Sequence, residues 1–311
     1  MEINNHQIFK DLFSRLSVKE LNDRIEYFRN NVDIRSSSEE KIRNELKKIF
    51  TVKYKDDFVT FFLNADIEIP QFQKNYFYRI REFQSEDYLG LITKCFSSIQ
   101  RKQDVWCRPN IEVKNYGRLN RPGKSVLYLS SQSVNAIYEK ECKIGDFFFL
   151  SIYQTKLKNI RMSQIQNIQY LDGFSEEENA KRILMHNFLF SEFTKYVSAG
   201  REYLYKSSLI IYEDYFCNDK IDGFCYPSIA SNFNMGYNVC FSQEKVDLNL
   251  SLVCVMVCKL LPSDGKSEFR VQPIYDGLLK DDNTISFHDY NSEFIQNKIG
   301  DYKMIRDLGI L

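Results

Sequence analysis

The pattern of apolar and polar positions divides the chain into two parts. The first part has two Ser-x-x-Glu sequences, Ser17–Glu20 and Ser37–Glu40, which fit the capping box that starts helices. Apolar residues recur at helical spacing after the second box. Pro70 lies in a stretch that breaks this pattern. The sequence therefore predicts a helical extension over residues 1–70 that packs on a main domain over residues 71–311.

The main domain begins with a change to short β-prone runs separated by polar connections. Helical patterns lie between these runs without strict alternation, which favours an α+β fold over a doubly wound sheet. No internal repeat or low-complexity tract is seen. The predicted strands cover residues 76–83, 125–131, 146–154, 224–230, 237–241 and 250–261.

Three segments of the main domain read as helices. Residues 133–141 form a short helical pattern after a predicted strand, and residues 201–216 favour helix over strand. The longest pattern opens with a capping box at Ser175. Its helical period places Ala180, Ile183, Leu184 and Leu189 broadly on one side of the helix.

Composition and charge narrow the function classes. Lys plus Arg and Asp plus Glu both total 42, so no net positive field favours nucleic acid or an anionic membrane. The longest apolar run is too short to span a bilayer, and the first residues lack the pattern of a signal peptide. The eight cysteines show no C-x-x-C spacing and the three histidines lie far apart, so we expect reduced thiols, no metal site and a cytoplasmic protein.

The usual catalytic motifs are missing from the sequence. Neither glycine-rich phosphate loop occurs, and neither H-E-x-x-H nor G-x-S-x-G is found. What remains is a group of polar and aromatic residues at the edges of predicted strands, each of which has an ordinary structural explanation when taken alone. These residues are Tyr78, Arg79, Arg81, Arg118, Asn120, Tyr128, Glu139, Ser228 and Asn238.

Taken together, these residues resemble the RES-domain family, which is named for a recurring Arg, Glu and Ser. The family pattern G-R-x-N-x-x-G-x-x-x-x-Y, with a Glu in A-x-x-E eleven residues after the Tyr, matches residues 117–139 with no change in spacing. An aromatic-Arg element matches residues 77–81, and Tyr-Pro-Ser followed by Gly-x-Asn matches residues 226–238. The departures are Leu119, where many members have an aromatic, and Ile229-Ala230, which replaces Val-Arg.

The resemblance implies a fold and an activity. The fold would be an ADP-ribosyltransferase-like mixed β core with flanking helices. The activity would be cleavage of the bond between nicotinamide and ribose in NAD+, with inorganic phosphate or water as the acceptor, as in an NAD+ phosphorylase or glycohydrolase. NAD+ is then a substrate, and no cofactor is expected. Because several members are toxins held in check by an antitoxin, an antitoxin or regulatory protein is an expected partner.

The resemblance also implies roles for individual residues. Arg118, Glu139 and Ser228 would be catalytic. The arginines suit the pyrophosphate because guanidinium groups bind phosphate oxygens in pairs, and Glu139 suits the positive charge that develops on the ribose. Tyr128 would form a wall for the nicotinamide, and Asn238 would support Ser228. The expected NAD+-binding residues are Tyr78, Arg79, Arg81, Asn120, Tyr128 and Asn238.

Two alternatives stay open at the level of sequence. One is an ADP-ribosyltransferase that modifies a macromolecule, since it would share the first half of the reaction. The other is a catalytically silent interaction protein that binds through its helical extension, although decay of the motif residues would then be expected.

Overall fold

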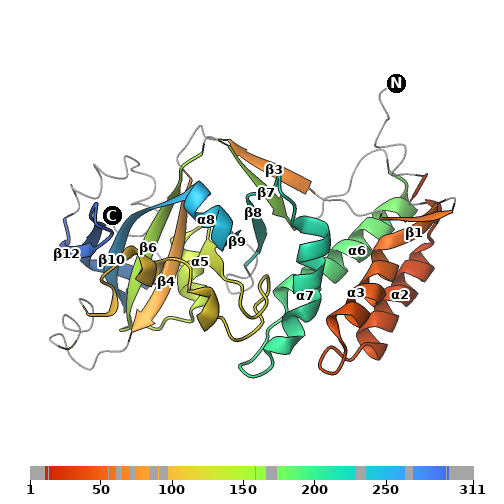
Figure 1. Ribbon diagram of the computed structural model, residues 1–311, viewed down its shortest axis with the longest axis horizontal. Helices are drawn as coiled ribbons and strands as arrows, with labels where there is room; N and C mark the ends of the chain where they lie inside the picture. Colours follow the sequence, from red (N-terminus) through yellow and green to blue (C-terminus); the bar gives the residue numbers. More distant parts are fainter. Residues whose placement is uncertain are drawn as a thin grey trace.

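A mixed β-sheet of ten described strands forms the centre of the protein in the computed structural model (Figure 1). The strand order is β12-β11-β10-β6-β4-β5-β9-β8-β7-β3, and β7 and β8 are the parallel pair among the described strands. The α+β class predicted from the sequence is confirmed. The structure describes residues 11–12, 14–54, 56–60, 65–70 (backbone only), 75–83, 90, 97–157, 159–165, 174–228, 236–262, 269–291 and 293.

The strands predicted from the sequence are present as β4, β5, β6, β8, β9 and β10. The pattern missed β1, β2, β3, β7, β11 and β12. The bounds are β1 Thr51–Tyr54, β2 Asp57–Thr60, β3 Ala65–Pro70, β4 Tyr76–Phe83, β5 Val126–Ser130, β6 Phe147–Thr155, β7 Asn159–Gln164, β8 Gly223–Pro227, β9 Tyr237–Ser242, β10 Leu250–Pro262, β11 Phe269–Leu279 and β12 Ile285–Asp289.

The helices include all three that the sequence predicted in the main domain. None of the described helices is both long and apolar enough to cross a lipid bilayer. The α-helices are α2 Val18–Asn31, α3 Glu39–Phe50, α5 Ser133–Glu139, α6 Glu176–Thr194, α7 Lys206–Ile211 and α8 Gln243–Asn249. Short 3-10 helices are η1 Lys102–Val105, η2 Asn110–Glu112 and η3 Glu202–Tyr205, and η4 Tyr212–Phe216 is a π-helix.

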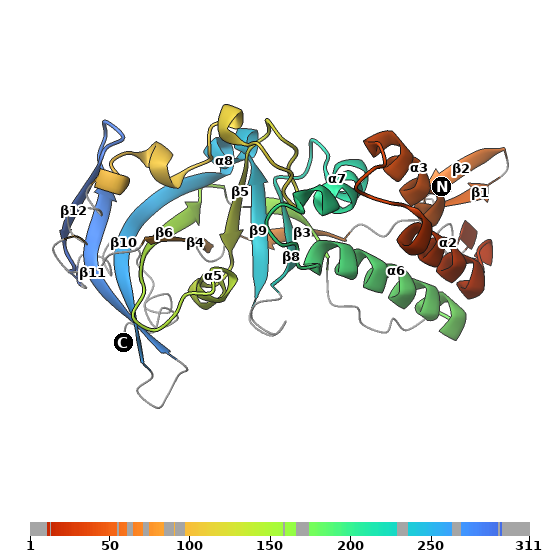
Figure 2. The same cartoon turned by 90° about the horizontal axis from the view of Figure 1, so that it is seen from below.

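The two faces of the sheet carry different elements, as Figure 2 shows for α5 and α8. On β4, Tyr78 and Ile80 pack with Ala136 and Ile137 of α5. Phe77 of the same strand belongs instead to the apolar cluster that contains residues of η1 and α8. Side chains alternate between faces along a strand, so every second residue of β4 lies on the α5 face.

The N-terminal helices share one apolar core with the end of the sheet. Leu21 of α2 and Ile42 of α3 belong to the same buried cluster as Phe188 of α6, Ile210 of α7 and Tyr226 of β8. Figure 1 shows these four helices together at one end of the molecule. The helices α2 and α3 contact α6 and α7, and α6 in turn contacts β8, the strand that precedes Ser228, so the extension packs on the sheet through α6 and α7.

The N-terminal segment differs from the predicted helical extension in three details. Ser17 caps α2 as predicted, but α3 is capped by Ser38 rather than Ser37, and the Ser38 hydroxyl accepts from the Lys41 amide. The strands β1 and β2 form a separate two-stranded ladder. The strand β3 pairs with β7 at the edge of the main sheet. The boundary predicted at Pro70 thus falls at the end of a strand that belongs to this sheet.

The apolar side predicted for α6 is buried only in part. The capping box at Ser175 is present in both directions. However, Ile183 is 40% exposed, whereas Lys181, Met185 and Phe188 are buried. Of the predicted side, Leu189 is buried and Leu184 packs against the apolar cluster that contains residues of α2, so the prediction fails at Ile183. The pattern of apolar residues alone could not show that the stem of Lys181 is buried.

Asp276 on β11 is a buried carboxyl, with 2% of its surface exposed. Burial raises the pKa of Asp276 to about 6, and the Asn291 amide and the charge of His288 act in the opposite direction. Its Oδ2 accepts from the Asn291 amide at 2.9 Å. Because the pKa is raised on folding, this group favours the folded state below about pH 4, and this contribution is lost as pH rises through about 6.

We expect Asp276→Asn to remove the loss of stability that occurs as pH rises through about 6. Asparagine keeps an acceptor for the Asn291 amide and carries no charge. The free energy of unfolding at pH 7 should rise by about 3 kcal/mol, since the pKa is raised from 3.8 to about 6 and one unit of pKa corresponds to about 1.36 kcal/mol. Urea unfolding at pH 4 and pH 7 measures this change. Asp289→Asn, an exposed position on β12, is the matched control. An unchanged pH dependence in the Asp276 variant would contradict the assignment.

Candidate functional site

Four side chains form a row across the α5 face of the sheet. Tyr78 of β4 pairs with Ser130 of β5, Ser130 pairs with Asn238 of β9, and Asn238 pairs with Tyr226 of β8. Residues that lie opposite each other in antiparallel strands point to the same face. Two of the residues expected in the site, Tyr78 and Asn238, are therefore placed in one line by strand register.

Glu139 reaches this row from the end of α5. Its Oε1 accepts from the Ser228 hydroxyl at 2.7 Å and from the Asn238 side-chain amide at 2.8 Å. The Ser130 hydroxyl contacts Asn238 Oδ1 at 3.5 Å. Three residues expected in the site, which come from widely separated segments, thus meet at one carboxylate oxygen.

The position of Glu139 is unfavourable by helix electrostatics alone. It is the last residue of α5, where the helix dipole disfavours a negative charge. The residue is exposed, whereas Ser228 and Asn238 are buried, with 0% and 7% of their surfaces exposed. Two buried donors therefore hold a solvent-accessible carboxylate in a fixed orientation, which is an arrangement suited to contact with a ligand.

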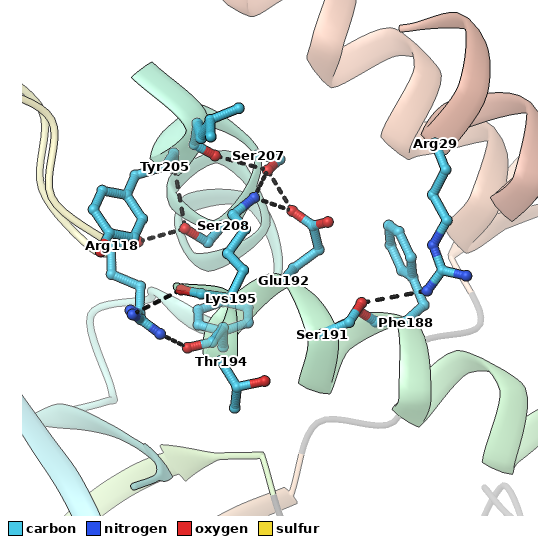
Figure 3. Close-up of polar contacts among 12 residues, drawn as sticks. Arg29, Arg118, Phe188, Ser191, Glu192, Thr194, Lys195, Tyr205, Ser207 and Ser208 are labelled. Atoms are coloured by element: carbon cyan, nitrogen blue, oxygen red, sulfur yellow. Dashed lines mark hydrogen bonds and ion pairs between the residues drawn. The ribbon is translucent and has the colours of Figure 1, made fainter. Parts of the chain in front are cut away.

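Arg118 lies on the same side of the sheet and is fixed by the end of α6 (Figure 3). Its Nη1 donates to the Phe193 carbonyl, and its Nη2 donates to the Lys195 carbonyl at 3.2 Å. The guanidinium lies over the rings of Tyr205 and Tyr226, 5.3 Å from each centroid. A cation at the C-terminal end of a helix and over aromatic rings is favourable, so Arg118 is held without a carboxylate.

The elements around Arg118 are bonded to each other. Lys195 Nζ donates to Glu192 Oε2 and to the Ser207 hydroxyl, both at 2.7 Å, which ties the end of α6 to the start of α7 (Figure 3). The Ser208 hydroxyl donates to the Arg118 carbonyl at 3.0 Å. Both the main chain and the side chain of Arg118 are thus anchored to this helix pair.

Arg118 and Glu139 both influence the pKa values of the same two residues, Tyr226 and Cys240. Burial raises the pKa of Tyr226 well above its usual value; Arg118 lowers it and Glu139 raises it further. Burial likewise raises the pKa of Cys240, with the same opposed contributions from the two charges. Arg118 lies over the Tyr226 ring, and the strand partner of Tyr226 is Asn238, which bonds Glu139. The Arg118 guanidinium and the Glu139 carboxylate therefore flank the strand pair Tyr226 and Asn238.

Asn120 and Tyr128 are used to close the turn that carries Arg118. The Tyr128 hydroxyl donates to Asn120 Oδ1 at 3.0 Å and accepts from the Leu119 amide at 2.9 Å. A Cβ at Gly117 would lie 2.1 Å from Asn120 Oδ1, so only glycine fits there. Burial raises the pKa of Tyr128, which keeps its hydroxyl protonated as a donor. The Tyr128 hydroxyl is therefore bonded within the turn, with Asn120 as its partner, and the role expected for the Tyr128 ring stays a prediction.

Arg79 and Arg81 lie apart from Glu139. Their alternation with Tyr78 places them on the face of β4 opposite to α5. Arg79 Nη1 donates to the Trp106 carbonyl at 3.1 Å, and Arg81 Nη1 contacts the Asp104 carbonyl at 3.4 Å. These arginines attach the η1 region to the sheet, and the structure does not bring them together with Arg118.

Sequence reasoning missed several residues of this region. Ser130 follows Tyr128 by two positions, so the strand period was a usable signal for it. Asn135 precedes Glu139 by one helical turn and is fully buried, and its amide atoms have no hydrogen-bond partner among the described residues. A Cβ at Gly236 would lie 2.6 Å from Asn135 Nδ2. Tyr205, the last residue of η3, carried no signal, because only tertiary packing brings η3 to Arg118.

Comparison with protein-family models, with curated proteins and with solved structures found no match for this chain. The described residues contain no group of three or more His, Cys, Asp or Glu side chains arranged to hold a metal ion. The chemistry of the site is therefore inferred from its own residues. They offer an oriented carboxylate, a hydroxyl and an amide beside a fixed cation.

Proposed function

We propose that the chain cleaves the bond between nicotinamide and ribose in NAD+ and transfers the ADP-ribosyl group to inorganic phosphate or water. The observation that carries the proposal is the convergence of Ser228 and Asn238 on the Glu139 carboxylate, with Arg118 one residue pair away. These are the residues that the RES-like sequence pattern selected. A fold of the ADP-ribosyltransferase type belongs to the same proposal.

The Glu139 carboxylate suits the charge that develops in this reaction. When the glycosidic bond breaks, nicotinamide leaves with the bonding electron pair and positive charge builds on the ribose carbon. A carboxylate held in advance stabilises that charge without reorganisation during the reaction. The acceptor oxygen then bonds to the ribose carbon and releases its proton to solvent. Because nicotinamide leaves as a neutral molecule, no strong general acid is needed.

Arg118 suits the anionic part of the substrate. No described carboxylate lies within ion-pair distance of its guanidinium, which is bonded to neutral carbonyls instead. A partly buried cation without a counter-charge favours the approach of an anion such as a pyrophosphate. Tyr78, in the same row of the sheet, is our candidate for contact with the nicotinamide ring.

Incubation of the purified protein with NAD+ tests the proposal. We expect nicotinamide release, with ADP-ribose as the product in water and its phosphorylated form when inorganic phosphate is present. The products are separated and identified by mass. Absence of nicotinamide release under both conditions would contradict the proposal. Release only when a protein or nucleic-acid acceptor is added would point to a macromolecular ADP-ribosyltransferase.

A further inference from the structure

One carboxylate of the N-terminal segment holds both ends of the turn that carries Arg118. Glu39 Oε1 accepts from the Tyr116 hydroxyl at 2.7 Å, and Glu39 Oε2 pairs with Arg121 Nη1 at 3.3 Å. Tyr116 immediately precedes residues 117–120, and Arg121 immediately follows them. The two oxygens of Glu39 therefore bracket the Gly-Arg-Leu-Asn turn.

Glu39 is well placed for this contact by its own helix. It is the first residue of α3 after the N-cap Ser38, where the helix dipole favours a negative charge. Its side chain is 27% exposed, so solvent screens its interactions only in part. Burial first, and then the hydrogen bond to Glu39, raise the pKa of Tyr116, so its hydroxyl stays protonated and donates.

The contacts of Glu39 with Tyr116 and Arg121, which we call the clamp, are extended by residues of the π-helix η4. Arg121 pairs with Glu213 through Nε at 3.0 Å and also through Nη2. Arg43 of α3 pairs with Asp214 and lies 3.7 Å from Glu213. The hydrogen bond to the Glu213 carboxylate raises the pKa of Arg121, because it stabilises the charged guanidinium. One network of charges thus joins α3, η4 and the turn.

The turn itself has little freedom to move without affecting Arg118. The Gly117 amide donates to the Asn120 carbonyl at 2.8 Å, and the Leu119 amide donates to the Tyr128 hydroxyl. Leu119 is buried in the same apolar cluster as Ile42 of α3. A shift of α3 relative to the turn would therefore displace the guanidinium.

We propose that Glu39 is a positioning residue: it couples the N-terminal helices to the turn and thereby fixes Arg118 in the site. This gives the segment outside the RES-like pattern a role in the catalytic unit. The structural part of the proposal stands on the contacts alone. Its catalytic part rests on the proposed function, in which Arg118 faces the substrate pyrophosphate.

Hydrogen exchange in Glu39→Gln tests the structural part. Glutamine still offers an oxygen to Tyr116, but its amide group cannot pair with Arg121. Because partly exposed ion pairs contribute up to about 1 kcal/mol, exchange of amides in residues 114–124 should accelerate about threefold to fivefold. Exchange in α6 should stay unchanged. Glu40→Gln is the matched control, since Glu40 lies in the same first turn of α3 and is exposed.

The two variants differ only if the clamp exists. Equal exchange of residues 114–124 in Glu39→Gln and Glu40→Gln would overturn the proposal, because both variants lose one charge from the same end of α3. Faster exchange throughout Glu39→Gln, α6 included, would also overturn it, since that result indicates general destabilisation. Neither outcome depends on NAD+ cleavage.

Kinetics with NAD+ test the catalytic part. A displaced Arg118 weakens substrate binding, so Glu39→Gln should raise KM about threefold to fivefold while kcat stays within about twofold of the wild type. Equal KM values in Glu39→Gln and Glu40→Gln, despite faster exchange of the turn, would overturn the positioning role in catalysis. If the wild-type protein does not cleave NAD+, the proposed function fails and the exchange result still decides the clamp.

Discussion

Replacement of Glu139 by glutamine is expected to slow NAD+ cleavage by about a hundredfold to a thousandfold. Glutamine keeps the Oε1 acceptor that receives the Ser228 hydroxyl and the Asn238 amide, so the local geometry is retained. The negative charge beside the developing ribose cation is lost. Loss of one such preorganised electrostatic contact costs about 2.7–4 kcal/mol in the transition state.

Nicotinamide release at saturating NAD+ measures this effect. We expect kcat to carry most of the loss, because the interaction with Glu139 strengthens as the charge develops. Glu141→Gln, an exposed position two residues further along the chain, is the control and should stay close to the wild type. Turnover by Glu139→Gln within about threefold of the wild type would refute the role given to this carboxylate, since uncharged glutamine cannot replace it.

Replacement of Arg118 by alanine should have the largest effect on stability. The Phe193 and Lys195 carbonyls would lose their donors at the end of α6, and the space over the Tyr205 and Tyr226 rings would be emptied. Each buried acceptor left without a donor costs about 1–3 kcal/mol. We therefore expect the free energy of unfolding to fall by about 2–5 kcal/mol.

Urea unfolding measures this loss, with Arg108→Ala at an exposed position as the control. Arg118→Lys then separates charge from geometry. Lysine keeps the positive charge, but one ammonium cannot reproduce the planar fork that serves two carbonyls. Its stability should lie between those of the wild type and Arg118→Ala. A stability of Arg118→Ala equal to that of Arg108→Ala would show that the contacts with α6 contribute nothing.

The two charged residues of the proposed site, Glu139 and Arg118, share one physical feature, which is that each is held by neutral groups. Glu139 is held by a hydroxyl and an amide, and Arg118 by carbonyls and aromatic rings. Neutral partners orient a charge without cancelling it. Arg121 differs, because it is paired with carboxylates.

Local patterns in the sequence determined the strands at the centre of the sheet and the starts of two helices. The runs that became β4, β6 and β10 have side chains that alternate or are continuously apolar, so burial selects a strand there in any context. Ser17 and Ser175 cap their helices as predicted, because capping depends on residues within one turn.

The sequence did not determine the outer strands of the sheet. β11 contains a proline at 273, where the register with β10 shifts, together with the buried Asp276. A proline cannot donate a ladder hydrogen bond and a carboxyl is rarely buried, so both residues argue against a strand. The pairing of β11 with β10 and β12 supplied what local propensity lacked.

The motif residues Glu139, Ser228 and Asn238 could be selected from the sequence, but only the tertiary structure decided which of the selected residues share a site. The alternation of side chains along β4 predicted two faces, but it did not show which face α5 covers. Because α5 covers the face opposite to Arg79, the fold separates Arg79 from Glu139. The strand register alone places Asn238 beside Tyr226 and so beside Arg118. Side-chain period is a local property, whereas the choice of face depends on helices packed from distant parts of the chain.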